Sequence, residues 1–115
     1  MNDISSERNL TMMTDLYQLT MMYGYYRCGM DKTEAVFDLF FRQRDNSAYA
    51  IMAGTESVID YINKLHFAPE DIEYLRSLNL FDEGFLKILA DMRFTGEIYG
   101  MPEGTVVFPY EPLIR

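Results

Sequence analysis

Apolar residues recur with helical spacing directly after a polar start at Thr14 and Asp15, and they predict a first helix over about residues 15–27. Either polar residue is a suitable N-cap, because its short side-chain oxygen can accept a hydrogen bond from the free amides of the first turn. Tyr17 falls on the side of the helix that is opposite to the apolar stripe. The stripe, which should face a core, consists of Leu16, Leu19, Met22, Tyr23 and Tyr26.

Two short apolar runs follow this helix, and both predict strands. Residues 36–41 are aromatic or branched on both faces, which indicates a central or well-covered strand. A turn is expected at residues 45–47 from their Asp-Asn-Ser composition, and the second strand is expected at residues 49–52.

Three amphipathic stretches then predict three helices. The first begins near Gly54, the second begins at Pro69, and the third follows Asp82, which can serve as its N-cap. Their inner faces should consist of Val58, Ile59, Ile62 and Leu65 in the first helix, Ile72, Leu75 and Leu78 in the second, and Phe85, Leu86, Leu89 and Met92 in the third.

The last part of the chain predicts two further strands, at residues 98–99 and 106–108, joined through a Pro-Glu-Gly turn at residues 102–104. The order of helix, two strands, three helices and two strands predicts a mixed α+β fold. With 115 residues the chain is long enough for one domain with a modest core. We therefore expect a single domain over residues 1–115.

Charge and cysteine content narrow the class of protein. The formal net charge of −8 argues against a general nucleic-acid surface, because phosphate backbones require clustered Lys and Arg side chains. The single cysteine, Cys28, cannot form an internal disulfide and fits a reducing cytosol. Neither a signal-peptide run in residues 1–8 nor a run of about 20 apolar residues is present. We expect a cytoplasmic protein that binds neither nucleic acid nor membrane.

The start of the first helix contains the first candidates for a binding site. Tyr17 is an aromatic residue off the apolar stripe, close to the Asp15 carboxylate and to the amides of a helix start, so it could stack on a flat ligand. The alternative is that Tyr17 packs under a neighbouring element and that Asp15 is only a cap. Both roles of Asp15 are compatible with one another.

Six segments, taken in order along the chain, resemble nicotinate phosphoribosyltransferases. The most specific is T-D-L-Y-Q-L-T-M at residues 14–21. The others are A-V-F-D-L-F-F-R at 35–42, A-I-M-A-G at 50–54, D-I-E-Y-L at 71–75, L-F-D-E at 80–83 and F-T-G-E-I-Y-G-M-P-E-G-T-V-V-F-P at 94–109. The resemblance covers almost the whole chain.

The resemblance implies a fold and a missing part. In that family the amino-terminal region forms an α/β-hammerhead-like layer, and a catalytic barrel of parallel strands follows it. We therefore expect this chain to be an amino-terminal fragment that lacks the barrel, exposes strand edges and is inactive by itself.

The resemblance also implies a reaction: transfer of a phosphoribosyl group from phosphoribosyl pyrophosphate to nicotinate, coupled to ATP hydrolysis, in a homodimer with shared active sites. It implies that Tyr17 stacks on the pyridine ring in a neighbouring subunit, with Asp15 close to the same pocket. Arg42 is implied to face substrate phosphates, although an exposed pairing with Asp38 is the simpler interpretation.

Other candidate groups receive structural interpretations. His66 is not the histidine that this family phosphorylates, which lies in the barrel, and we expect it to have a role at a helix end. No catalytic, cofactor-binding or metal-binding residue is expected in this chain, since it has neither a Cys/His cluster nor a Gly-rich phosphate loop. Magnesium and ATP are implied only for the complete enzyme.

Two other interpretations stay open. The chain could be an independent acidic module for protein interaction or oligomerisation, although its last segment, at residues 111–115, stops without a cap or polar tail. It could also belong to a relative that acts on nicotinamide or another base. The T-D-L-Y-Q start favours nicotinate, but the resemblance implies that base choice is set mostly by residues outside this chain.

Overall fold

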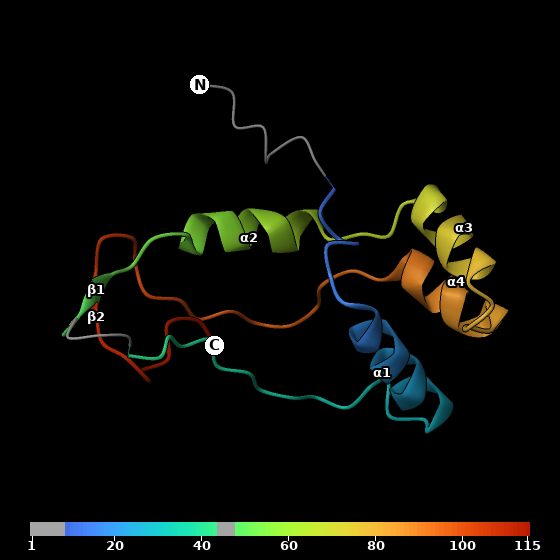
Figure 1. Ribbon diagram of the computed structural model, residues 1–115, viewed down its shortest axis with the longest axis horizontal. Helices are drawn as coiled ribbons and strands as arrows, with labels where there is room; N and C mark the ends of the chain where they lie inside the picture. Colours follow the sequence, from blue (N-terminus) through green and yellow to red (C-terminus); the bar gives the residue numbers. More distant parts are fainter. Residues whose placement is uncertain (1–8, 44–47) are drawn as a thin grey trace. The chain divides into compact units, whose positions relative to one another are not determined.

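The computed structural model describes residues 9–43 and 48–115, with four helices and two strands among them (Figure 1). The predicted turn at residues 45–47 lies outside the described residues. The elements are α1 (Leu16–Arg27), β1 (Ala50–Ile51), α2 (Thr55–Lys64), α3 (Pro69–Ser77), α4 (Glu83–Asp91) and β2 (Val106–Val107). The mixed composition of helix and short strand agrees with the α+β prediction.

The chain divides into two compact units, which we call the helical unit and the strand unit. The helical unit consists of Met1–Thr33 and Asn63–Phe94, and the strand unit consists of Glu34–Ile62 and Thr95–Arg115. Each unit is therefore built from two separate stretches of the chain. Each has its own cluster of buried apolar side chains.

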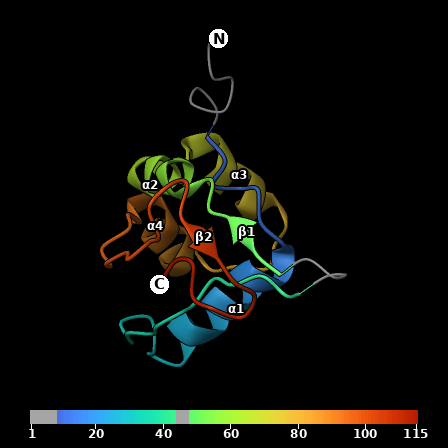
Figure 2. The ribbon, with the colours of Figure 1, turned by 90° about the vertical axis from the view of Figure 1, so that its left-hand side faces the viewer.

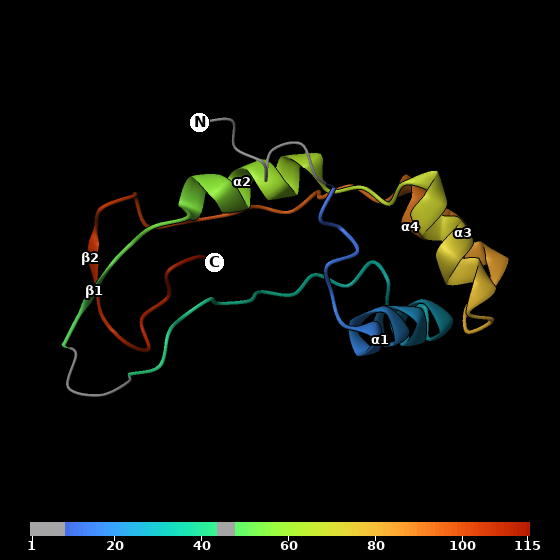
Figure 3. The ribbon, with the colours of Figure 1, turned by 45° about the horizontal axis from the view of Figure 1, so that its top comes forward.

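Helices α1, α3 and α4 surround the core of the helical unit, and α3 and α4 lie side by side (Figure 3). Burying each large apolar side chain of such a core contributes roughly 1.5–3 kcal/mol. The predicted inner faces of α3 and α4 are confirmed. The buried members of this core are Leu19, Phe67, Ile72, Leu75, Phe85, Leu86 and Leu89.

Aromatic packing fixes the rotation of α1 about its axis. The Tyr23 ring meets the Phe81 ring edge-on, with centroids 5.6 Å apart, and lies 5.2 Å from the Phe85 ring. Tyr26 also packs on Phe85, at 5.8 Å. Leu16 differs from its prediction, since it is 50% exposed: it precedes the turns of α1 that carry these contacts.

The strand unit contains one antiparallel pair, in which Ala50 pairs with Val107 and Ile51 with Val106 (Figure 2). Its buried apolar side chains are Met52, Val107 and Ile114. The strand expected at residues 49–52 is thus present but shorter.

The prediction of a strand at residues 36–41 is wrong. Leu39 makes one isolated bridge to Ile114, while Val36 and Phe37 are 78% and 81% exposed. The apolar pattern indicated cover on both faces, but the described residues place no element over this segment.

The segment at residues 113–115 is extended and hydrogen-bonded on both sides. Leu39 exchanges backbone bonds with it, donating to the Ile114 carbonyl at 2.8 Å and accepting from the Leu113 amide at 2.7 Å. On the other side, Tyr99 and Arg115 exchange a pair of bonds at 2.8 and 2.7 Å. The strand expected at residues 98–99 is therefore replaced by this ladder of isolated pairings.

The Pro-Glu-Gly turn is confirmed, and it also holds the start of α2. The Thr105 amide donates to the Pro102 carbonyl at 3.2 Å, and Gly104 has a φ of 81°, which favours glycine. The Glu103 carboxylate accepts from the amides of Gly54, at 2.9 and 3.0 Å, and of Glu56, at 3.2 Å. The inner face predicted for α2 is only partly formed, since Ile59 is exposed.

Candidate functional site

Tyr17 is the most exposed aromatic side chain of α1. It is 60% exposed, whereas Leu19, two positions further on, is 4% exposed in the core. This contrast follows from the packing of Tyr23 and Tyr26, which turns the opposite side of the helix away from α4. Among the described residues the Tyr17 ring makes no aromatic contact, so the prediction that it lies off the apolar stripe is confirmed.

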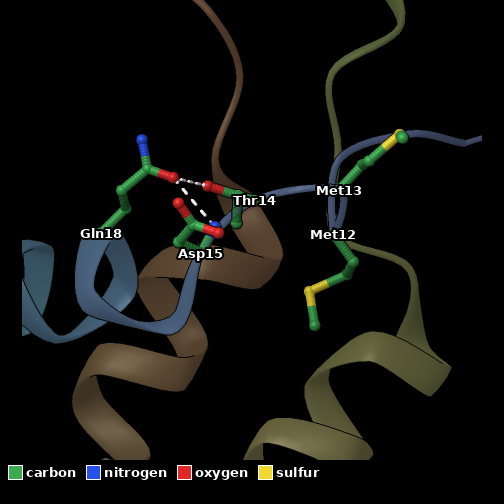
Figure 4. A pocket seen from close by; sticks show the side chains of 5 residues that line it. All are labelled: Met12, Met13, Thr14, Asp15 and Gln18. Carbon is green, nitrogen blue, oxygen red and sulfur yellow. Dashed lines mark hydrogen bonds between the residues drawn. The ribbon is translucent and has the colours of Figure 1, made fainter.

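An open hollow of about 340 Å3 lies beside the first turn of α1 (Figure 4). Gln18 reaches back across it: its Oε1 accepts from the Asp15 amide at 3.0 Å and from the Thr14 hydroxyl. The hollow is lined by Met12, Met13, Thr14, Asp15 and Gln18.

Asp15 occupies the N-cap position, with φ −84° and ψ 146°, as predicted. Its carboxylate, however, makes no cap hydrogen bond within the described part of the chain. The backbone N–H of Gln18 donates instead to the backbone carbonyl of Asp15, at 3.0 Å. The predicted N-cap position of Asp15 is therefore confirmed, and the residue lines the hollow together with Gln18.

The chain segment that leads into the hollow is held by Asn9, Thr11 and His66. The Asn9 amide donates to the His66 carbonyl at 3.0 Å, and the buried Thr11 hydroxyl accepts from the His66 amide at 3.1 Å. His66 Nδ1 lies 2.7 Å from the Lys64 carbonyl, which assigns the proton to that nitrogen. The expected helix-end role of His66 is confirmed.

Arg42 belongs to the strand unit, while Asp15 and Tyr17 lie together in the helical unit. The simpler interpretation of Arg42, a pairing with Asp38, is wrong. Asp38 accepts from Arg115, at 2.7 and 3.1 Å. The Arg42 side chain is exposed and has no hydrogen bond or ion pair with any described residue.

Sequence reasoning overlooked Gln18, Met12, Met13 and the Asn9–His66 contacts. A signal for Gln18 was available, because an acid followed three positions later by Gln is the spacing of a capping box. The two methionines carried no signal, since Met is common in cores. The contacts of Asn9 join residues 57 positions apart and leave no local pattern.

The described residues support neither a metal site nor a membrane-spanning helix. No group of three or more His, Cys, Asp or Glu side chains among them could hold a metal ion. No helix in residues 9–43 or 48–115 is long and apolar enough to cross a membrane. Cys28 is an exposed residue at the C-cap of α1.

A mixed α+β fold built from a helical unit and a strand unit is the class that these observations define, and comparison with known proteins identifies its family. The family model described as the nicotinate phosphoribosyltransferase (NAPRTase) N-terminal domain matches residues 12–115. The chain belongs to this family. The predicted resemblance and the predicted fold class are thereby confirmed.

Similar proteins agree with this assignment. Nicotinate phosphoribosyltransferase pncB2 of Mycobacterium tuberculosis (strain H37Rv) is 42% identical over 103 residues, covering 89% of this chain and 22% of that protein. Nicotinate phosphoribosyltransferase of Bacillus subtilis (strain 168) is 39% identical over 108 residues, covering 93% and 22%. The crystal structure of human nicotinic acid phosphoribosyltransferase matches with a TM-score of 0.78 and 32% identity, covering 88% of this chain and 21% of that one. The chain thus spans about a fifth of the length of these relatives.

Proposed function

We propose that this chain is the amino-terminal part of a nicotinate phosphoribosyltransferase. The reaction would join nicotinate to the phosphoribosyl group of phosphoribosyl pyrophosphate, releasing pyrophosphate and forming nicotinate mononucleotide for NAD synthesis. Family membership and the names of the relatives support this assignment. The chain itself contributes no catalytic residue and is inactive alone, because the catalytic barrel implied by the family resemblance is not part of it.

The exposed ring of Tyr17 is the observation on which the assignment of substrate contact rests. A flat ring held outward by a helix whose other side is buried is suited to stacking on the pyridine ring of nicotinate. In the proposed homodimer, Tyr17 stacks on nicotinate in the active site of the neighbouring subunit. Stacking of this kind positions the acceptor nitrogen for attack on the sugar.

Asp15 and Arg42 supply charge at two different places. The Asp15 carboxylate accepts hydrogen bonds from ribose hydroxyl groups or orients the ring. Arg42, which has no ion-pair partner among the described residues, offers a planar guanidinium that matches two phosphate oxygens. Asp38 is paired with Arg115 and therefore does not neutralise Arg42, which favours the phosphate-binding role of Arg42.

The departing pyrophosphate would require magnesium, and ATP hydrolysis would be coupled to the transfer. The described residues offer no metal site, so we assign neither group to this chain. Both remain predictions for the complete enzyme, as do its cytoplasmic location and the single domain over residues 1–115.

The proposal is tested by measuring the size and the enzymatic activity of the protein that its natural reading frame encodes. The reading frame that contains this chain should continue into a barrel, and the isolated protein should form nicotinate mononucleotide from nicotinate, phosphoribosyl pyrophosphate and ATP. Residues 1–115 produced alone should form none. A natural product that ends at Arg115 would contradict the proposal and favour the acidic interaction module, for which the exposed Val36, Phe37 and Tyr110 would be a contact surface.

A further inference from the structure

Tyr110 has a backbone conformation that tyrosine rarely adopts. Its φ is 64°, in the left-handed region where a β-carbon is crowded. A turn at residues 108–111 imposes this angle: the Glu111 amide donates to the Phe108 carbonyl at 3.4 Å, and Pro109 precedes Tyr110 within the turn. Turns with proline at the second position and a positive φ at the third favour Gly or Asn at that third position. The chain therefore carries a tyrosine where the local backbone disfavours one.

Burial of the ring does not account for this tyrosine. The Tyr110 side chain is 63% exposed. The Phe40 ring lies 6.1 Å away, between centroids, but Phe40 is itself 45% exposed. Packing of this kind offsets only part of the backbone strain. Strained residues that packing does not explain are concentrated at binding and active sites.

Tyr110 lies beside Arg42, which has no ion-pair partner among the described residues. The Tyr110 amide donates to the Phe41 carbonyl at 2.9 Å, and Arg42 is the next residue. Leu39 and Phe41 both bond to the segment at residues 110–114, which is the alternation of an extended chain. Phe41 packs against the apolar cluster of the strand unit, so Phe40 and Arg42 share the opposite face. The Tyr110 ring packs on that same face, through Phe40.

We propose that the Tyr110 hydroxyl binds a phosphate oxygen of phosphoribosyl pyrophosphate together with Arg42. The inference rests on the proposed function, in which Arg42 faces that phosphate. A phenol donates one hydrogen bond, and a bond to an anion is stronger than a bond between neutral groups. Asp38, which shares this face, is held by Arg115 at 2.7 and 3.1 Å, so it leaves the guanidinium of Arg42 to the substrate.

The test is made in the complete enzyme, by measuring the thermal midpoint and the KM for each substrate. Tyr110→Asn should raise the thermal midpoint, because asparagine suits the left-handed position. It should also raise KM for phosphoribosyl pyrophosphate about tenfold and leave KM for nicotinate unchanged, because the hydroxyl is lost. Tyr110→Phe should raise the same KM equally, although the ring remains.

Two further variants separate this role from a general effect of the surface. In an Arg42→Ala background, Tyr110→Phe should raise KM for phosphoribosyl pyrophosphate less than it does alone, since both groups bind one phosphate. Tyr99→Phe is the matched control: Tyr99 is another exposed tyrosine of the strand unit, and its hydroxyl donates to Glu97 at 3.0 Å. This variant should leave both KM values unchanged.

Two results would overturn the inference while leaving the proposed function intact. One is an unchanged KM for phosphoribosyl pyrophosphate in Tyr110→Phe when Arg42→Ala raises it. The other is a lower thermal midpoint in Tyr110→Asn, which would show that the ring is present to hold the turn. If Arg42→Ala also leaves this KM unchanged in an active enzyme, the phosphate-binding role of Arg42 fails, and that of Tyr110 fails with it.

Discussion

Arg115 donates two parallel hydrogen bonds to Asp38, from Nε to Oδ1 at 2.7 Å and from Nη2 to Oδ2 at 3.1 Å. The two residues are 77 positions apart, and each lies beside the backbone pairing of Leu39 with Ile114. The ion pair therefore closes the same junction that the backbone bonds form. Such a two-point contact fixes direction as well as distance.

Stability should depend on pH through this pair. The Arg115 guanidinium, mainly through its hydrogen bonds, holds the pKa of the Asp38 carboxyl below its ordinary value. Because the unfolded chain has the higher pKa, of about 3.9, the contribution is complete above that value. It is lost as the pH falls through the lowered pKa of the folded state.

Carboxyl titration of Asp38 by NMR measures this effect directly. The midpoint should lie below the ordinary value and should rise in Arg115→Gln, which removes the cation. An unchanged midpoint in this variant would show that another group lowers the pKa.

Tyr17→Ala in the complete enzyme should raise KM for nicotinate. A stacked pair contributes about 0.5–1.5 kcal/mol, which corresponds to roughly a 2- to 13-fold change. Tyr17→Phe should retain most of the affinity, because the ring remains. Tyr25→Ala, which removes another exposed tyrosine of α1, is the control and should leave KM unchanged.

Asp82→Ala should destabilise the helical unit by about 1–2 kcal/mol, as expected for loss of an N-cap. The Asp82 carboxylate also accepts from the Tyr23 hydroxyl at 3.2 Å and lies 3.6 Å from Arg27, so α1 would loosen as well. Amide hydrogen exchange of α1 and α4 measures this. Asp91→Ala, at the other end of α4, should be neutral or slightly stabilising, because a negative charge is unfavourable at a helix end.

Gly84→Ala and Gly24→Ala should have opposite effects, although both replace a helical glycine. A β-carbon at Gly84 would collide with the Tyr26 hydroxyl, whose ring is held by Phe85, whereas nothing lies within 4 Å at Gly24. Gly24→Ala should stabilise the protein by up to about 1 kcal/mol, from helix propensity alone. Gly84→Ala should lower the thermal midpoint, and an increase there would mean that the Tyr26 ring moves aside without loss.

The helical unit could be predicted closely because its signals are local. The caps at Asp15 and Asp82, the proline at Pro69 and the apolar faces of α3 and α4 all depend on residues within one or two turns. The exposure of Tyr17 followed from the same periodicity.

The strand unit was predicted less well because its partners are distant. Residues 36–41 have the composition of a covered strand, yet only Leu39 is paired among the described residues. The partner of Asp38 lies at Arg115, and that of Gly54 lies at Glu103. At the candidate site, periodicity located Tyr17 and the N-cap position of Asp15, whereas the contact of the Gln18 side chain with the Asp15 amide was not predicted.

The division of each unit between two stretches of chain sets an order of assembly during synthesis. Helices α3 and α4 are neighbours in sequence and can pair as soon as both have left the ribosome. Residues 34–62 must wait for residues 95–115 before β1 finds β2, Glu103 caps α2 and Asp38 meets Arg115. The largely exposed apolar segment at residues 36–41 therefore emerges long before its partners, and until then it is a surface on which the nascent chain can aggregate.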